Sequence, residues 1–243
     1  MKDKFTYFDF LAYFIPGAVI LWICSVMAKD LGVLSVLEMG NVFTESLAFI
    51  VLAFVVGHFI QFRSRQKTEV TIKEKYWSNA FVSEAFLLKD NEFCSEFKRH
   101  RYINLLQKHF GLTGESAKIL DDENEEARLI SHGMYRECFT FITDKGIGQK
   151  STKANEYYNF FRGLSTTCVY STIVSAMDFV YLSIRFFTHR TFVGLAHALT
   201  MLALTIFFGY AVYAFRIRAK QRGELHVAEV FDSMAGYFAE KPS

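Results

Sequence analysis

Residues Leu164–Phe187, with the sequence LSTTCVYSTIVSAMDFVYLSIRFF, form an apolar run long enough to cross a lipid bilayer as an α-helix, for which about 20 residues suffice. Polar residues interrupt the run at spacings of three, four and seven, which place them on one face of a helix. These residues are Thr167, Ser171, Ser175, Asp178 and Arg185. A carboxylate at membrane depth costs at least about 2.5 kcal/mol and is rarely left facing lipid. We therefore expect this polar stripe to face another helix, another subunit or water.

The composition of the whole chain indicates a membrane protein with a modest soluble part. The chain has 243 residues, of which 51% are hydrophobic, and the apolar residues gather in a few long runs. The net charge of +2 is nearly neutral and gives no nucleic-acid signature for the chain as a whole. The four cysteines lack zinc-type and CxxC spacing, so we expect them to be reduced and structural.

Four apolar runs predict four transmembrane helices, because unsatisfied backbone groups exclude open strands and loops from lipid. The predicted spans are Phe10–Ala28, Ser46–Phe62, Leu164–Phe187 and Phe192–Phe215. The predicted fold class is therefore all-α: a polytopic membrane protein with a helical cytoplasmic insert between its second and third spans. The predicted domains are an N-terminal membrane hairpin (1–62), the insert (63–163), a second membrane hairpin (164–215) and a basic, amphipathic tail (216–243). Within the tail we expect Gly223 to break the helix.

The distribution of basic residues predicts the orientation of these spans. Most of the 27 Lys and Arg residues lie in the insert, and others flank the termini. The positive-inside rule then places the insert and both termini in the cytoplasm, in agreement with an even number of spans. The first apolar run is too long for the hydrophobic part of a signal peptide, so we expect no cleavage there.

The polar stripe has two interpretations that the sequence leaves open. In the first, small and polar residues allow helices to pack closely within one bundle. In the second, copies of the chain surround an axis and the stripe lines an aqueous or gated path. The candidate partners of Asp178 are Arg185 on its own span, His197 in the fourth span and His58 near the inner end of the second.

A compact basic cluster, KRHRY, occupies Lys98–Tyr102 in the insert. We predict that Lys98, Arg99 and Arg101 contact a partner, although a solvated helix face is the alternative interpretation. The sequence contains no GxGxxG, P-loop, HExxH or GxSxG motif. We therefore expect no enzyme activity, no catalytic residue, no metal site and no cofactor, and we regard direct nucleic-acid binding as unsupported.

Several membrane-proximal segments resemble those of small four-span bacterial proteins. They are FDFLAYFIPGAVIL in the first span, VVGHFIQ in the second, YYNFFRGLS at Tyr157–Ser165 and the basic segment FRIRAKQRGELH after the fourth. With its helical insert, this plan is similar to membrane components of anti-phage defence systems such as the membrane subunit of the Kiwa system (KwaA). The resemblance implies a homo-oligomer in the bacterial inner membrane and a cytosolic partner that is a nuclease or a nucleic-acid-binding protein. It assigns no role to any single residue.

The leading functional hypothesis is a bacterial inner-membrane sensor or effector of a defence system. It would couple a cytoplasmic signal or partner protein to membrane perturbation or to recruitment. A non-conducting scaffold or assembly protein is the first alternative, and a small channel or transporter is the second. The sequence has no internal inverted repeat, which counts against a transporter.

Overall fold

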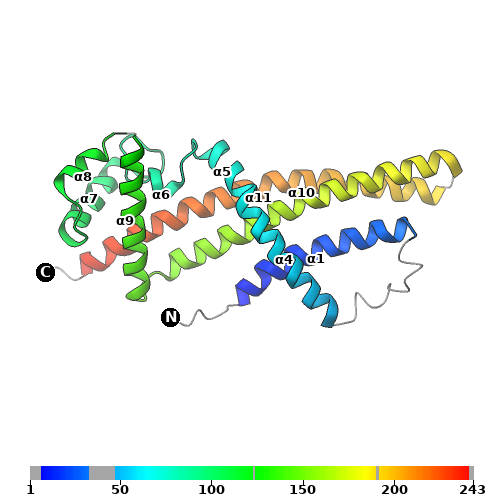
Figure 1. Cartoon of the computed structure of the whole chain (residues 1–243), viewed down its shortest axis with the longest axis horizontal. Coiled ribbons are helices and arrows are strands. Elements are labelled where there is room, and N and C mark those ends of the chain that lie inside the picture. The colour runs from blue at the N-terminus through cyan, green and yellow to red at the C-terminus, as the bar shows by residue number, and fades with distance from the viewer. Residues whose placement is uncertain (1–6, 33–46, 123, 190–191, 241–243) are drawn as a thin grey trace. The chain divides into compact units, whose positions relative to one another are not determined.

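The computed structural model describes residues 7–32, 47–122, 124–189 and 192–240, and all secondary structure in these ranges is helical (Figure 1). The four long apolar helices are α1 (Tyr7–Asp30), α4 (Leu47–Gln66), α10 (Gln149–His189) and α11 (Phe192–Glu240). The shorter helices are α5 (Thr68–Tyr76), α6 (Val82–Ala85), α7 (Glu96–His109), α8 (Gly114–Ile119) and α9 (Glu125–Asp144). The predicted all-α class is confirmed, as is the position of the shorter helices between the second and third apolar ones.

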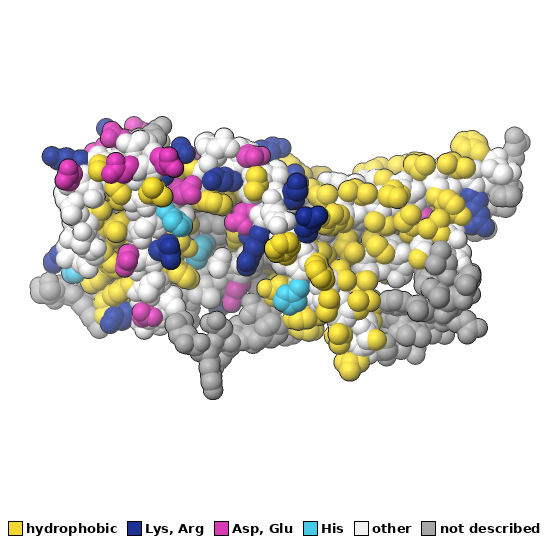
Figure 2. All heavy atoms as spheres, viewed as in Figure 1, with side chains coloured by type: hydrophobic (Ala, Val, Ile, Leu, Met, Phe, Trp, Pro, Cys, Tyr) yellow, Lys and Arg dark blue, Asp and Glu magenta, His cyan; other side chains and the backbone are white. Residues whose placement is uncertain are grey.

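Each of the four long helices is long and apolar enough to cross a membrane. The exposed side chains agree with this, because one face of α10 presents an apolar series at helical spacing. This series consists of Ile173, Met177, Val180 and Ile184. Hydrophobic side chains cover much of the same helices on the face shown in Figure 2. The chain is therefore a multi-pass membrane protein.

The chain divides into two compact units, to which α10 and α11 both contribute. The first, here called the membrane unit, comprises Met1–Val70 and Asn159–Ala219. The second, here called the helical unit, comprises Thr71–Tyr158 and Lys220–Ser243.

The expected helix break at Gly223 is wrong, because α11 continues through this residue. A Cβ atom at Gly223 would lie 2.9 Å from the ring of Trp77 and 3.4 Å from that of Tyr158. The glycine therefore allows two aromatic rings to approach the helix backbone. A single glycine inside a helix lowers its stability only modestly, so the packing of the rings decides the local structure.

The core of the helical unit joins the C-terminal part of α11 to the short helices. The rings of Phe86, Tyr102 and Phe231 stack on one another, with centroids 5.0 to 6.1 Å apart. None of the three side chains is more than 1% exposed. The C-terminal part of α11 therefore packs on the helices of the insert.

In the membrane unit, α1 and α4 cross at a point where their backbones touch. A Cβ atom at Gly17 would lie 1.7 Å from the carbonyl oxygen of Ala53, and one at Gly57 would lie 1.8 Å from that of Tyr13. Small residues at such a crossing allow close approach of membrane helices. Pro16 lies within α1 and does not end it.

We predict that Gly57→Ala destabilises the protein by about 1–3 kcal/mol, because the added methyl group meets backbone that cannot rotate away. Gly209→Ala is the matched control, since nothing lies within 4 Å of a Cβ atom there and the residue is also in an apolar helix. The thermal unfolding midpoint of the purified protein in detergent measures both changes. Equal midpoints for the two variants would contradict the close contact of the α1 and α4 backbones.

Candidate functional site

Four of the five residues of the polar stripe of α10 face the interior of the membrane unit, whereas Arg185 is exposed. Thr167, Ser171, Ser175 and Asp178 are each no more than 1% exposed. The hydroxyl of Ser175 donates to the carbonyl oxygen of Ser171 at 2.7 Å and accepts a hydrogen bond from Thr205 of α11 at 3.0 Å. The Thr167 hydroxyl donates to the carbonyl oxygen of Gly163 at 3.1 Å. Helices of the same chain thus cover the stripe.

Asp178 belongs to a group of charged side chains near one end of the membrane unit. Its carboxyl group interacts electrostatically with Asp30 and His197. Arg185 donates to the backbone carbonyl of Asp30 at 3.3 Å, and the Nδ1 atom of His197 lies 4.0 Å from a carboxylate oxygen of Asp30. The structure therefore places the predicted partners Arg185 and His197 against Asp30, the last residue of α1. Sequence reasoning missed Asp30, although an acid at the end of a predicted span is a visible signal.

Asp178 and Ser171 keep buried oxygen atoms without hydrogen-bond donors. Within the described part of the chain, no hydroxyl, amide or basic side chain donates to either carboxylate oxygen of Asp178, and the hydroxyl of Ser171 has no partner. Buried polar atoms are nearly always satisfied in folded proteins, so these exceptions mark a site that water, an ion or another donor would complete.

His58 lies apart from this group, at the crossing of α1 and α4. Its ring stacks on Tyr13, with centroids 4.0 Å apart, and meets Phe54 edge-on at 4.6 Å. Within the described residues, His58 therefore contacts its own helix and the neighbouring helix α1. Of the candidate partners of Asp178, His58 is not among the groups that interact with its carboxyl group.

A second buried polar network joins α1, α4, α5 and α10, and sequence analysis did not single it out. The side-chain amide of Gln61 donates to the carbonyl oxygens of Ala12 at 3.0 Å and Asn159 at 3.3 Å. Arg162, only 3% exposed, forms an ion pair with Glu69. Because these groups are satisfied by one another, the network positions helices and needs no ligand.

The three residues of α7 predicted to contact a partner occupy different environments. Arg99 is 1% exposed and donates to the carbonyl oxygens of Leu87 at 2.8 Å and Leu120 at 3.2 Å. It also pairs with Asp121 at 2.6 Å. The partner-binding role predicted for Arg99 is incompatible with this position. A cluster of charges in the sequence does not reveal which one turns inward. Lys98 and Arg101 are on the surface, where Lys98 pairs with Asp232 at 3.0 Å.

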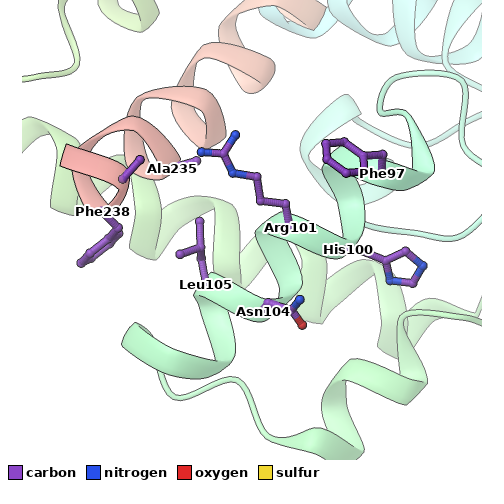
Figure 3. Close-up of a pocket in the computed structure, with 8 residues that line it drawn as sticks. Phe97, His100, Arg101, Asn104, Leu105, Ala235 and Phe238 are labelled. Atoms are coloured by element: carbon purple, nitrogen blue, oxygen red, sulfur yellow. The ribbon is translucent and has the colours of Figure 1, made fainter. Parts of the chain in front are cut away.

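A shallow groove of about 500 Å³ runs between α7 and the C-terminal part of α11 (Figure 3). Its lining residues are Phe97, His100, Arg101, Asn104, Leu105, Ala235, Phe238 and Ala239. Figure 3 shows Arg101 and Leu105 extending from α7 toward the α11 segment, whereas His100 points away from it. The groove combines apolar walls with the exposed guanidinium of Arg101, as a protein-binding surface does.

His226 of α11 lies in a buried hydrogen-bonded network of the helical unit. Its Nδ1 atom is 2.9 Å from both the hydroxyl and the carbonyl oxygen of Ser151, and its Nε2 atom is 2.7 Å from the Tyr135 hydroxyl. Burial lowers the pKa of His226, an effect that the hydrogen bond to the Ser151 carbonyl opposes. A neutral ring therefore donates from Nδ1 to this carbonyl and accepts from Tyr135. Although Ser151 and His226 are adjacent, Ser151 is fully buried and no substrate reaches it.

The remaining candidate chemistry is limited. Within the described ranges, no three His, Cys, Asp or Glu side chains are grouped so that they could hold a metal ion. The four cysteines are free, and burial raises the pKa of Cys138 to about 12, which keeps this thiol protonated and unreactive.

No protein family, no curated protein and no solved structure matches this chain. The fold and the polar site define its class by architecture alone, as a multi-pass membrane protein with four apolar helices and a compact helical unit.

We predict that Arg99→Lys destabilises the helical unit by about 1–3 kcal/mol, because a lysine cannot satisfy the carbonyl oxygens and the carboxylate together. Arg101→Lys, two residues away and exposed, is the control and should change stability by no more than about 0.5 kcal/mol. Thermal unfolding followed by tryptophan fluorescence measures both variants. Similar midpoints for the two would show that Arg99 is not buried in its network.

We predict that stability decreases as the pH falls below about 6.5, the ordinary pKa of histidine. The unfolded chain binds a proton at His226 more readily than the folded chain, so acid favours unfolding by up to about 1.4 kcal/mol per pH unit. His226→Gln should flatten this dependence of the unfolding midpoint, because the titrating ring is removed. If the pH dependence of the unfolding midpoint were the same in His226→Gln as in the wild type, the lowered pKa of His226 would be refuted.

Proposed function

We propose that this protein is a sensor or effector of an anti-phage defence system in the bacterial inner membrane, and that it acts by recruiting a cytosolic protein. The observation that carries this proposal is the inward position of the polar stripe. Because Thr167, Ser171, Ser175 and Asp178 are covered by helices of their own chain, they favour packing over a conduction path between copies. The architectural resemblance to the membrane subunit of the Kiwa system supports the defence setting.

The helical unit is the element that receives the signal or partner. The basic residues that flank the spans favour a cytoplasmic position for this unit and for both termini. Its core includes Phe231 of α11, so a bound partner contacts a unit built partly from a membrane helix. A nuclease or a nucleic-acid-binding protein fits the proposed setting, with Lys98 as a surface contact.

A small channel is the second candidate function, and one specific observation favours it. Among the described residues, no hydroxyl, amide or basic side chain donates to the carboxylate oxygens of Asp178, and the hydroxyl of Ser171 has no partner. Water or a cation would satisfy both, and polar residues of this kind line the paths of ion channels. The two candidates differ in whether the protein makes a membrane permeable.

We expect liposomes that contain the purified protein to be no more permeable to K⁺ or protons than protein-free liposomes, as measured with fluorescent ion indicators. We also expect Asp178→Asn, which preserves side-chain size, to leave the survival of phage-infected cells at the wild-type level. Asp178→Leu tests the need for a polar side chain at this position, and Met177→Leu, at an exposed neighbour, is the control.

Wild-type ion flux that disappears in Asp178→Asn would replace the recruitment proposal with the channel. If expression of the wild-type protein does not change the survival of infected cells, the defence setting is wrong. Membrane fractionation of infected cells measures recruitment directly, by comparing cells with and without this protein. A recruited cytosolic protein should sediment with the membranes only when this protein is present.

A further inference from the structure

We propose that two different surfaces of the helical unit bind each other between copies of this chain. The inference rests on the proposed function, because it identifies a partner of the α7 face that includes Arg101. That partner is a second copy of the same chain. Both surfaces adjoin the C-terminal part of α11 but use different faces of this helix.

The first surface is the exposed face of α7, with Phe97 and Arg101 four residues apart and therefore adjacent on the helix. Phe97 is 82% exposed, more than the other large hydrophobic residues of the described chain. A single exposed phenylalanine would need no explanation. Here it borders the groove of Figure 3, together with Leu105 and the guanidinium of Arg101.

The second surface is a groove of about 510 Å³ between the turn after α9 and the other face of α11. Ile147 and Tyr237 form its apolar part, and Gly146 and Gly236 leave space beside them. A Cβ atom at either glycine would meet nothing within 4 Å. The groove is therefore open enough to accept a side chain from outside.

The charges of the second groove complement those of the first surface. Three carboxylates and one lysine line it: Glu229, Asp232, Glu240 and Lys150. Asp232 already pairs with Lys98 and accepts a hydrogen bond from Tyr102 at 2.6 Å. Glu229 and Glu240 are the acidic residues that remain to bind a cation from a second copy. The groove as a whole is net negative, whereas the α7 surface carries the positive charge of Arg101.

The proposed contact places the ring of Phe97 against Ile147 and Tyr237, with Arg101 facing Glu229 and Glu240. Phenylalanine and arginine are both enriched in protein interfaces, and an arginine forms strong charge-assisted bonds with carboxylates. Because the two surfaces differ, the contact is head-to-tail, and its repetition gives a closed ring or an open array.

Charge reversal in the full-length protein tests this contact. Arg101→Glu should weaken self-association at least about tenfold, as should the double variant Glu229→Arg with Glu240→Arg. Combining all three substitutions should restore association. Lys118→Glu, on α8 and outside both surfaces, makes the same change of charge and should have no effect. Mass photometry of the protein in nanodiscs measures the distribution of oligomers across a dilution series.

A cross-link locates the contact independently of any association through the membrane helices. One copy carries Phe97→Cys and a differently tagged copy carries Ile147→Cys. Oxidation after mixing should join the two tags through these positions, as identified by peptide mass spectrometry, and Arg101→Glu should abolish the product. Absence of this cross-link, together with an oligomer distribution that Arg101→Glu does not alter, would overturn the inference.

Infected-cell survival separates this inference from the proposed function. Loss of survival in Arg101→Glu with an unchanged oligomer would mean that the α7 face binds a different protein, which overturns the inference and leaves recruitment standing. Weakened self-association in Arg101→Glu with restoration by the triple variant supports the inference, even if no variant affects survival and the defence setting fails.

Discussion

Hydrocarbon offers no hydrogen bonds, and this constraint decides which faces of the long helices point into the protein and which face lipid. The exposed apolar residues of α10, such as Met177 and Val180, lie on a different face from the polar residues Thr167, Ser171, Ser175 and Asp178, which are buried against the same chain. Ser175 illustrates the result, because its hydroxyl bonds to its own helix and to Thr205 of α11. A polar stripe buried in this way sets the rotation of α10 about its axis. The face left for lipid follows from it.

At the crossing of α1 and α4, the close approach of the two helix backbones also stabilises the membrane unit. Water cannot be released between helices in a bilayer, so close packing contributes much of their association. Gly17 and Gly57 each face a backbone carbonyl of the opposite helix at a distance that excludes any side chain. The Gln61 amide then bonds to Ala12 on α1 and to Asn159 on α10. Glycine contacts and a satisfied amide thus help to hold these helices together.

The sequence predicted the features that depend on long runs of residues. Its predictions were wrong where the local structure depends on a single contact between residues far apart in the chain. Four spans and the helices between the second and third were readable because hydropathy over about 20 residues averages many side chains. The continuity of α11 through Gly223 was not readable, because it depends on the rings of Trp77 and Tyr158. The burial of Arg99 likewise depends on the carbonyl of Leu120, which lies far from it in the sequence. The grouping of Asp30 with Asp178 required knowledge of how α1 packs on α10.

Two charged residues of α10, Arg162 and Asp178, are almost fully buried in the membrane unit, and their surroundings assign them different roles. Arg162 bonds to Ser64 and forms an ion pair with Glu69, so its charge is neutralised by neighbouring helices. A fully satisfied network of this kind rigidifies a core and gains nothing from a ligand. Asp178 has the carboxyl group of Asp30 and the ring of His197 nearby, but no hydroxyl, amide or basic side chain in the described chain donates to its carboxylate oxygens. Burial of a charged group is therefore not by itself a sign of function in this protein. The distinction lies in whether the described residues supply hydrogen-bond donors to the buried group. By that standard Asp178, and not Arg162, is the residue whose side chain is open to a bond with water, an ion or another donor.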